Sequence, residues 1–224
     1  MKLTQTFLAI VTVLGLGLGR AESQESNPGI VPNGPVYGQL AANWWVWAAE
    51  TQANKAAILD TTGKDCGSNQ KGDVFFLAGT LDGSPVTRTC KVPKGVSLFF
   101  PLSNDFYGAF LTDPADQRTE AFIRSQVECV AGAVVTATID GVPVNDPEQY
   151  LEKSALFSLQ LPKKNIFGVT AAQVPDLTLS PSVDEGYYLL VKPLAPGAHT
   201  IQFTAAPGES CGGTQDVTYH LTVK

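Results

Sequence analysis

Two dense apolar runs stand near the middle of the chain, at residues 73–80 and 95–102, and a mixed run at residues 85–92 lies between them. In both apolar runs, the side chains that would point to either face of an extended strand are mostly apolar. Strands of this kind are covered on both faces. The pattern therefore predicts that these two strands lie in the middle of the molecule.

Further strands are predicted at residues 133–139, 156–161 and 186–194. The clearest signal is a closing hairpin formed by residues 199–205 and 217–223, in which apolar side chains share one face and mainly threonines share the other. Seven or more strands separated by turn residues predict a mainly β fold, a single-domain β-sandwich of the immunoglobulin-like or jelly-roll-like kind.

Two stretches have helical periodicity, near residues 38–59 and 114–131. In the first, Trp44 and Trp47 recur at the spacing of one helix face. The second follows Asp113, a residue type that suits a helix N-cap. We expect two accessory helices that pack on an end or an edge of the sandwich.

The beginning of the chain predicts a targeting segment. A basic start at Lys2 precedes an apolar run that ends in small residues, as in a secretory signal peptide spanning residues 1–21. Residues 22–36 then predict an extended leader, and residues 37–224 the sandwich domain. The apolar run is short and no second one follows, so we expect a secreted chain, extracellular or periplasmic, with no transmembrane segment after cleavage.

The charge balance restricts the partners. The formal net charge is −6, and removal of Lys2 and Arg20 with the signal would leave 13 basic against 21 acidic residues, a net charge of −8. An acidic surface disfavours nucleic acid as a partner and leaves neutral glycans or other proteins open. The oligomeric state stays open at this point.

The four cysteines are Cys66, Cys90, Cys129 and Cys211. In an exported chain they predict two disulfides with three possible pairings, of which sequence order favours Cys66–Cys90 and Cys129–Cys211. No Cys-x-x-Cys motif occurs, so we predict neither a redox site nor a metal site, and no cofactor. Ca²⁺ alone stays open, because Asp-rich turns carry the oxygen ligands that this ion prefers.

Several short motifs occur together in one order. They are WWVW at 44–47, DTTG at 60–63, FLAGT at 76–80, RTCKVP at 88–93 and PGAHTIQF at 196–203. Together they resemble a broad group of uncharacterised exported bacterial proteins, and the resemblance implies export and a single domain but no activity. The segment from Leu194 to the end also resembles the final hairpin of immunoglobulin-like modules, which bears on the fold only.

The aromatic and basic candidates for ligand binding are Tyr37, Trp45 and Arg88. An exposed Trp45 beside Tyr37 would form a stacking surface for a sugar ring, whereas the alternative is that the tryptophans fill the core. Arg88 alternates with inward-facing Val86 and Cys90. There it needs a carboxylate or several carbonyl groups as partners, unless it binds an anion in a cleft.

A predicted aromatic-rich loop at residues 103–111 supplies Asn104 and Tyr107 as further ligand-binding candidates, since binding residues concentrate on loops. The same loop holds Asp105. Together with Glu50 or Asp113, this acid could form the paired carboxylates of a glycoside hydrolase.

We interpret the chain as a secreted, non-catalytic binding or cell-surface protein whose ligand is a glycan or another protein. The reason is that no catalytic motif is legible, and most of the recognisable sequence forms strands. One alternative is a polysaccharide-acting hydrolase that uses Asp or Glu as acid and base. Another is a structural subunit that assembles by edge pairing or by donation of the leader as a strand.

Overall fold

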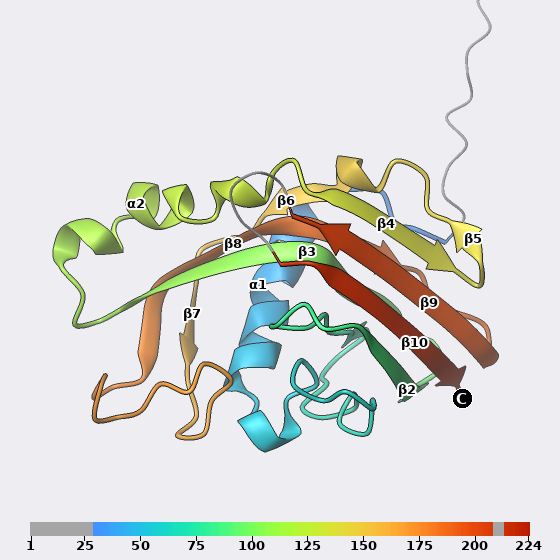
Figure 1. Cartoon of the computed structure of the whole chain (residues 1–224), viewed down its shortest axis with the longest axis horizontal. Helices are drawn as coiled ribbons and strands as arrows, with labels where there is room; N and C mark the ends of the chain where they lie inside the picture. Colours follow the sequence, from blue (N-terminus) through green and yellow to red (C-terminus); the bar gives the residue numbers. More distant parts are fainter. Residues whose placement is uncertain (1–28, 208–212) are drawn as a thin grey trace, which may run out of the picture.

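The computed structural model describes residues 29–207 and 213–224. Two five-stranded sheets form a single-domain β-sandwich with two α-helices, which confirms the predicted fold class (Figure 1). The predicted signal peptide, residues 22–28 of the predicted leader, and Cys211 lie outside the described residues.

The first sheet is built around its two longest strands, which pair antiparallel with each other. Its order is β1 (Val74–Phe76), β3 (Ser97–Phe110), β8 (Thr178–Val191) and β6 (Leu151–Lys153), and β7 (Phe157–Gln160) also pairs with β8.

The second sheet contains the predicted closing hairpin, which is confirmed. Its order is β2 (Val86–Val92), β10 (Gln215–Val223), β9 (Gly197–Ala206), β4 (Val134–Ile139) and β5 (Val142–Pro143). In the hairpin, Tyr219 is paired with Ile201 and Val217 with Phe203, and all four side chains are buried.

The core fills both faces of the first sheet. On one face, Phe100 stacks on Phe203 of the second sheet with ring centroids 5.3 Å apart. On the other face, Phe99 meets Tyr37 of helix α1 (Pro35–Glu50) at 5.8 Å. Since neighbouring residues of a strand point to opposite faces, α1 covers the face turned away from the second sheet (Figure 1).

The prediction about the two central strands is only half correct. β3 is central, but only Val74–Phe76 of the run at residues 73–80 forms a strand, and that strand lies at the sheet edge. The predicted loop at residues 103–111 is wrong, because β3 continues to Phe110. Its backbone finds partners along β8, whose strand begins at Thr178 and so precedes the predicted start at residue 186.

The first helix begins at Pro35 and ends at Glu50, whereas the periodicity predicted residues 38–59. Thr51 is already extended, with φ −77° and ψ 133°, and its hydroxyl donates to the Trp47 carbonyl at 2.6 Å. The side chain thus occupies a carbonyl at the helix end, and the chain continues into a 3₁₀ turn at Ala53–Lys55.

The second predicted helix, at residues 114–131, consists of three short pieces. They are 3₁₀ turns at Ala115–Arg118 and Glu128–Val130 and the helix α2 (Glu120–Ser125) between them. Thr119 caps α2 by accepting from the Phe122 amide at 3.3 Å. Asp113, the predicted cap, instead accepts from the Phe110 amide at 2.8 Å.

The described end of the leader pairs with its own chain. Ile30 bridges Val191 in antiparallel fashion, and the Val31 amide donates to the Leu190 carbonyl at 2.8 Å. Residues 29–31 therefore extend the first sheet at β8 within the same chain.

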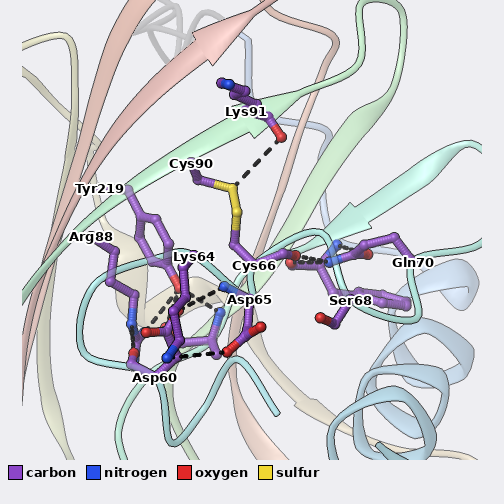
Figure 2. Close-up of a disulfide and its surroundings, with 12 residues drawn as sticks. Asp60, Lys64, Asp65, Cys66, Ser68, Gln70, Arg88, Cys90, Lys91 and Tyr219 are labelled. Atoms are coloured by element: carbon purple, nitrogen blue, oxygen red, sulfur yellow. Dashed lines mark hydrogen bonds and ion pairs between the residues drawn. A yellow bond between two sulfur atoms is a disulfide. The ribbon is translucent and has the colours of Figure 1, made fainter. Parts of the chain in front are cut away.

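One predicted disulfide is confirmed. The Cys66–Cys90 bond joins the loop after α1 to the middle of β2 (Figure 2). The predicted Cys129–Cys211 bond involves a residue outside the described range. No helix within the described ranges is long and apolar enough to cross a membrane.

We predict that the double variant Cys66→Ala/Cys90→Ala lowers the free energy of unfolding by about 3 kcal/mol, because the bond closes a loop over a sequence separation of 24 residues in the unfolded chain. Urea denaturation followed by circular dichroism measures this loss. The control Thr87→Ala lies on the exposed face of the same strand and should lose less than about 1 kcal/mol. Equal losses in the two proteins would contradict the assignment.

Candidate functional site

A cavity of about 420 Å³ lies beside β3, at the point where β1 has ended. β1 pairs with β3 only over Ser97–Phe99, so that no described strand pairs with this side of β3 beyond Phe99. We call the cavity the β3 groove; among its lining residues are Trp45, residues 79–81, residues 101–106, Phe167 and Gln215.

The free edge of β3 has the polar groups of an unpaired strand. The last backbone hydrogen bond on this side of β3 runs from the Leu77 amide, in the segment that follows β1, to the Phe99 carbonyl, at 3.0 Å. Pro101 has no amide hydrogen, and the Phe106 amide donates to the adjacent Asp105 carboxylate at 2.9 Å. Proline and a nearby charge are devices that limit uncontrolled pairing at a sheet edge.

Three aromatic rings stack at the groove. The ring centroids of Trp45 and Phe106 lie 4.5 Å apart, and those of Phe106 and Phe167 lie 5.8 Å apart. Trp45 is only 5% exposed, whereas Phe167 is 38% exposed. The groove therefore offers Phe167 and part of Phe106 to a ligand, with Trp45 packed beside them.

A buried carboxylate, Asp184 of β8, lies directly behind the groove. One of its oxygens, Oδ2, accepts from Trp45 Nε1 at 2.5 Å and from Asn104 Nδ2 at 3.1 Å. The other, Oδ1, accepts from the Tyr188 hydroxyl at 2.7 Å. Burial, together with a smaller contribution from the nearby charge of Asp105, raises the pKa of Asp184 to about 7 against the effect of these three hydrogen bonds.

Asn104 connects this carboxylate to the groove. It lines the cavity, and its Nδ2 also donates to the Tyr188 hydroxyl at 2.9 Å. Gly186 lies opposite Asn104 in the β3–β8 register, and a Cβ atom there would collide with Asn104 Cβ. The glycine thus allows the close approach of β8 that places Asn104 against Asp184.

A buried cation, Arg88 of β2, positions another part of the groove lining. Arg88 as a whole is 1% exposed, and its guanidinium donates to the Ala78 carbonyl at 2.5 Å and the Gly79 carbonyl at 3.0 Å. It also donates to the Asp60 carbonyl at 2.6 Å and to the Tyr219 hydroxyl at 2.9 Å (Figure 2). These bonds fix the chain that leads from β1 into residues 79–81.

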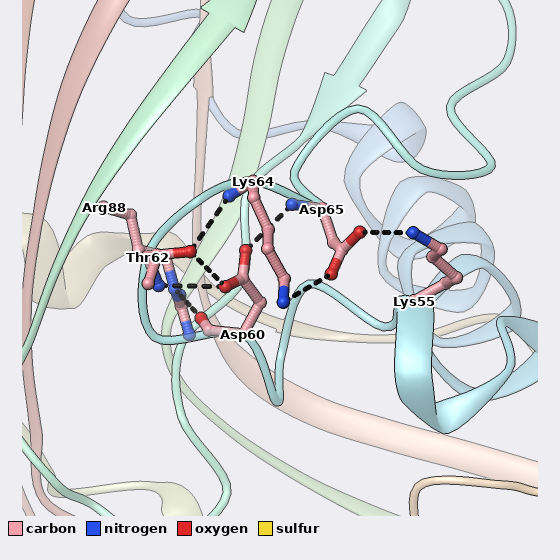
Figure 3. A network of polar contacts seen from close by, with 6 residues as sticks. All are labelled: Lys55, Asp60, Thr62, Lys64, Asp65 and Arg88. Atoms are coloured by element: carbon pink, nitrogen blue, oxygen red, sulfur yellow. Dashed lines mark hydrogen bonds and ion pairs between the residues drawn. The ribbon is translucent and has the colours of Figure 1, made fainter.

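The loop that supplies the Asp60 carbonyl is itself fixed by a side-chain turn (Figure 3). The Asp60 carboxylate accepts from the Thr62 amide and from the Asp65 amide, each at 2.9 Å. Burial raises the pKa of Asp60, but these hydrogen bonds outweigh burial, and the pKa lies below its ordinary value. Lys55 pairs with Asp65 at 3.2 Å and ties the loop to the 3₁₀ turn after α1.

The predicted sugar-stacking surface of Tyr37 and Trp45 is wrong. Tyr37 is fully buried; its hydroxyl donates to the Val31 carbonyl at 2.6 Å and accepts from the Leu190 amide at 3.2 Å. Burial raises the pKa of Tyr37 above its ordinary value. Both rings are covered because α1 packs against the first sheet, so the alternative prediction, aromatic residues in the core, is the correct one.

Arg88 is buried and protein groups occupy its donors, so the structure does not place it in a cleft as the anion-binding prediction requires. Of the two kinds of partner expected for it, the carbonyl groups are found, at residues 60, 78 and 79, whereas no carboxylate of the described residues pairs with it. Tyr107 does not line the groove, and its ring meets Phe122 of α2 edge-on at 6.1 Å. Of the predicted ligand-binding residues, Asn104 and the largely buried Trp45 do line it.

The predicted catalytic acids are not brought together. Only Asp105 lines the β3 groove, and burial raises its pKa. Glu50, at the end of α1, accepts from the Gln160 amide at 2.9 Å and lines a different cavity of about 310 Å³. Asp113 is bonded to the Phe110 amide. The described part of the chain holds no group of three or more metal-ligating side chains.

Sequence reasoning missed Asp184. The predicted strand at residues 186–194 began two residues too late to include it. With β8 extended to Thr178, alternation puts Asp184 on the same face as Tyr188 and opposite to Val183. An acid on the same buried face as Tyr188 and Leu190 is the signal that could have identified it.

Comparisons with known proteins add little. No protein-family model matches the sequence, and no curated protein matches it. A cysteine protease inhibitor from Entamoeba histolytica is 14% identical, with 61% of this chain and 86% of that chain covered and a TM-score of 0.22. Amebosin is 9% identical, with 62% of this chain and 96% of that chain covered and a TM-score of 0.23. At such TM-scores neither likeness carries an argument about this chain.

We predict that Arg88→Met lowers the free energy of unfolding by roughly 3–5 kcal/mol, because it leaves three carbonyls and a hydroxyl buried without this donor. Urea denaturation at pH 7 measures the loss. The control Lys91→Met lies on the exposed face of the same strand and should change stability by less than about 1 kcal/mol. A loss below about 1 kcal/mol in Arg88→Met would show that the network contributes little.

The buried acid predicts a pH dependence of stability. Because its pKa is raised to about 7 in the folded protein, native Asp184 keeps a proton that the unfolded chain has already released. The free energy of unfolding should therefore fall by roughly 3 kcal/mol through this group as the pH rises from about 5 to about 8.5.

Urea denaturation across this pH range should show the fall in the wild type and a smaller one in Asp184→Asn, which cannot ionise. The pKa of His199 is raised by its bond to Asp140, which produces a fall of the same sign in both proteins. The difference between the two curves therefore isolates Asp184. Parallel curves would mean that Asp184 does not titrate in this range.

Proposed function

We propose that this chain is an exported, non-catalytic binding protein whose β3 groove holds an extended segment of another polypeptide. The observation that carries the proposal is the free edge of β3 along a cavity of about 420 Å³. Extended peptides bind such edges by adding a strand, with main-chain hydrogen bonds for affinity and side-chain pockets for specificity.

The groove chemistry supports a peptide with apolar side chains. Phe106 and Phe167 supply ring surface, and Leu81, which is 46% exposed, supplies aliphatic surface. Asp105 is the one charged side chain among the described lining residues. A segment that is neutral or carries a single basic residue near Asp105 therefore fits better than an acidic one.

The geometry supports binding over polysaccharide hydrolysis. A glycoside hydrolase needs two carboxyl groups that flank the scissile bond, about 5–10 Å apart. Asp184 is fully buried, and Trp45, Asn104 and Tyr188 occupy its oxygens. Asp184 therefore cannot approach a substrate. Asp105 is the one acid among the described residues that line the groove, so the second carboxyl group of a glycoside hydrolase is not found there.

Export is the second part of the proposal. The Cys66–Cys90 disulfide supports it, since such bonds persist in oxidising compartments. The secretory pattern at residues 1–21 supports it as well. We place the protein outside the cytoplasm, in the extracellular space or the periplasm, where its partner would be another exported or surface-exposed protein.

The test is selection of peptides from a displayed random library on the immobilised wild-type protein, followed by fluorescence anisotropy with the selected peptides. Leu81→Arg should weaken binding tenfold or more, because it places a large charged side chain at the groove. The control Leu111→Arg changes a residue of similar exposure, 44%, at the far end of β3, and should change affinity less than twofold.

Hydrogen exchange should show that a bound peptide protects those amides of residues 102–106 that point away from β8. A glycan array on the same protein provides the opposing result. If no peptide is selected, and the protein retains glycans in a manner that Leu81→Arg abolishes, the groove binds sugar instead. If the molecular mass rises with protein concentration and Leu81→Arg abolishes that rise, the groove pairs two copies of this chain instead.

A further inference from the structure

The hydrogen-bond directions around Asp184 form one consistent set. Trp45 Nε1, Asn104 Nδ2 and the Tyr188 hydroxyl all donate to its two oxygens, as suits an ionised carboxylate. Asn104 Nδ2 has a second acceptor in the Tyr188 oxygen, at 2.9 Å. Both amide hydrogens of Asn104 are therefore directed into the protein.

The amide oxygen of Asn104 is consequently the atom left for the groove. No described residue donates to it, and Asn104 is partly exposed and lines the cavity. A bound segment thus meets a hydrogen-bond acceptor at this position, at the free edge of β3.

A proton on Asp184 would reverse this arrangement. The new O–H group needs an acceptor, and the Trp45 indole can only donate. If Asp184 donates to Asn104, the amide must turn its oxygen inward. If Asp184 instead donates to the Tyr188 oxygen, the Tyr188 hydroxyl can no longer donate to Asp184. It needs another acceptor, and the Asn104 amide oxygen becomes that acceptor once the amide turns. Both routes place the amide nitrogen of Asn104 toward the groove.

We infer that Asp184 is a positioning residue that sets the hydrogen-bonding character of the β3 groove through the orientation of the Asn104 amide. With Asp184 ionised, the groove offers an acceptor at Asn104; with Asp184 neutral, it offers a donor. This inference rests on the proposed function, because the bound segment is what would sense the difference.

The surroundings of Asp184 place the change in a measurable pH range. From β3, Asp105 adds a like charge, and from β8 itself, Tyr188 is the titratable neighbour. Helix α1 contributes Trp45, and the segment after β6 contributes Ser154, whose hydroxyl oxygen accepts from the Asp184 amide at 2.8 Å; neither titrates. Glu185 pairs with Lys153 at 3.6 Å on the opposite face of β8. Burial raises the pKa of Asp184 to about 7.

The test compares two peptide selections, one at pH 8.5 and one at pH 5.5, each followed by affinity measurements at both pH values. A peptide selected at pH 8.5 should bind about tenfold more weakly at pH 5.5, with a midpoint near pH 7, and a peptide selected at pH 5.5 should show the reverse. Asp184→Asn should bind with the affinities of the wild type at pH 5.5 throughout.

Two further variants separate this effect from others. Asp105→Asn removes the other groove acid. It should keep the pH dependence but lower its midpoint, because the like charge beside Asp184 is gone. Loss of the pH dependence in this variant would assign the effect to Asp105. Asn104→Ala removes the amide and should make peptide affinity independent of pH while Asp184 still titrates. Because position 104 is partly exposed, this variant also provides a test if Asp184→Asn does not fold.

Nuclear magnetic resonance of the free protein keeps this inference distinct from the proposed function. The ¹⁵N–¹H signals of the Asn104 side chain and the Trp45 indole should shift with a midpoint near pH 7, and Asp184→Asn should abolish that shift. Signals that do not titrate, with peptides bound equally at both pH values, would overturn the inference and leave the function intact. Titrating signals without any bound peptide would overturn the function alone.

Discussion

One buried cation, Arg88, needs a hydrogen-bond acceptor for each of its donors, and this need constrains much of the structure. Arg88 lies in the second sheet, yet its guanidinium binds carbonyl groups of the loop at Asp60 and of the segment at Ala78 and Gly79, together with the hydroxyl of Tyr219. A charge this deep is tolerated only when its donors are occupied. The carbonyls therefore have to stay where they are, and the connection from β1 to β2 is held beside β3.

The end of β1 and the groove have one common cause. The segment after Phe76 leaves the first sheet to reach Arg88, so β1 is only three residues long and β3 loses its neighbour beyond Phe99. Gln215 then holds Thr80, donating to its carbonyl at 2.9 Å and accepting from its amide at 2.8 Å. An edge is thus exposed where the chain is otherwise well ordered by hydrogen bonds, a combination that suits recognition.

The two buried charges have different roles because their surroundings differ. Arg88 has four acceptors, all of them protein groups, and none of its donors is directed at the groove, so it is structural. Asp184 also has its oxygens occupied, but burial brings its pKa close to neutrality, and Asn104, one of its three partners, is shared with the groove. A buried acid of this kind links proton binding to the surface through a side chain that can turn.

The sequence by itself determined the fold class, the inward face of the closing hairpin and the buried character of Arg88, because alternation and turn chemistry are local properties of a strand. It favoured the Cys66–Cys90 pairing but left two other pairings open, and the structure decided between them. It could not determine that α1 ends at Glu50, that Asn104 lies in β3 rather than in a loop, or that Tyr37 and Trp45 are covered. Those outcomes depend on which elements pack together: β8 supplies partners for residues 103–110, and the first sheet covers the aromatic face of α1. Asp184, Asn104 and Trp45 come from three separate elements, and their meeting was decided by the tertiary structure alone, since no local pattern encodes the distance between them.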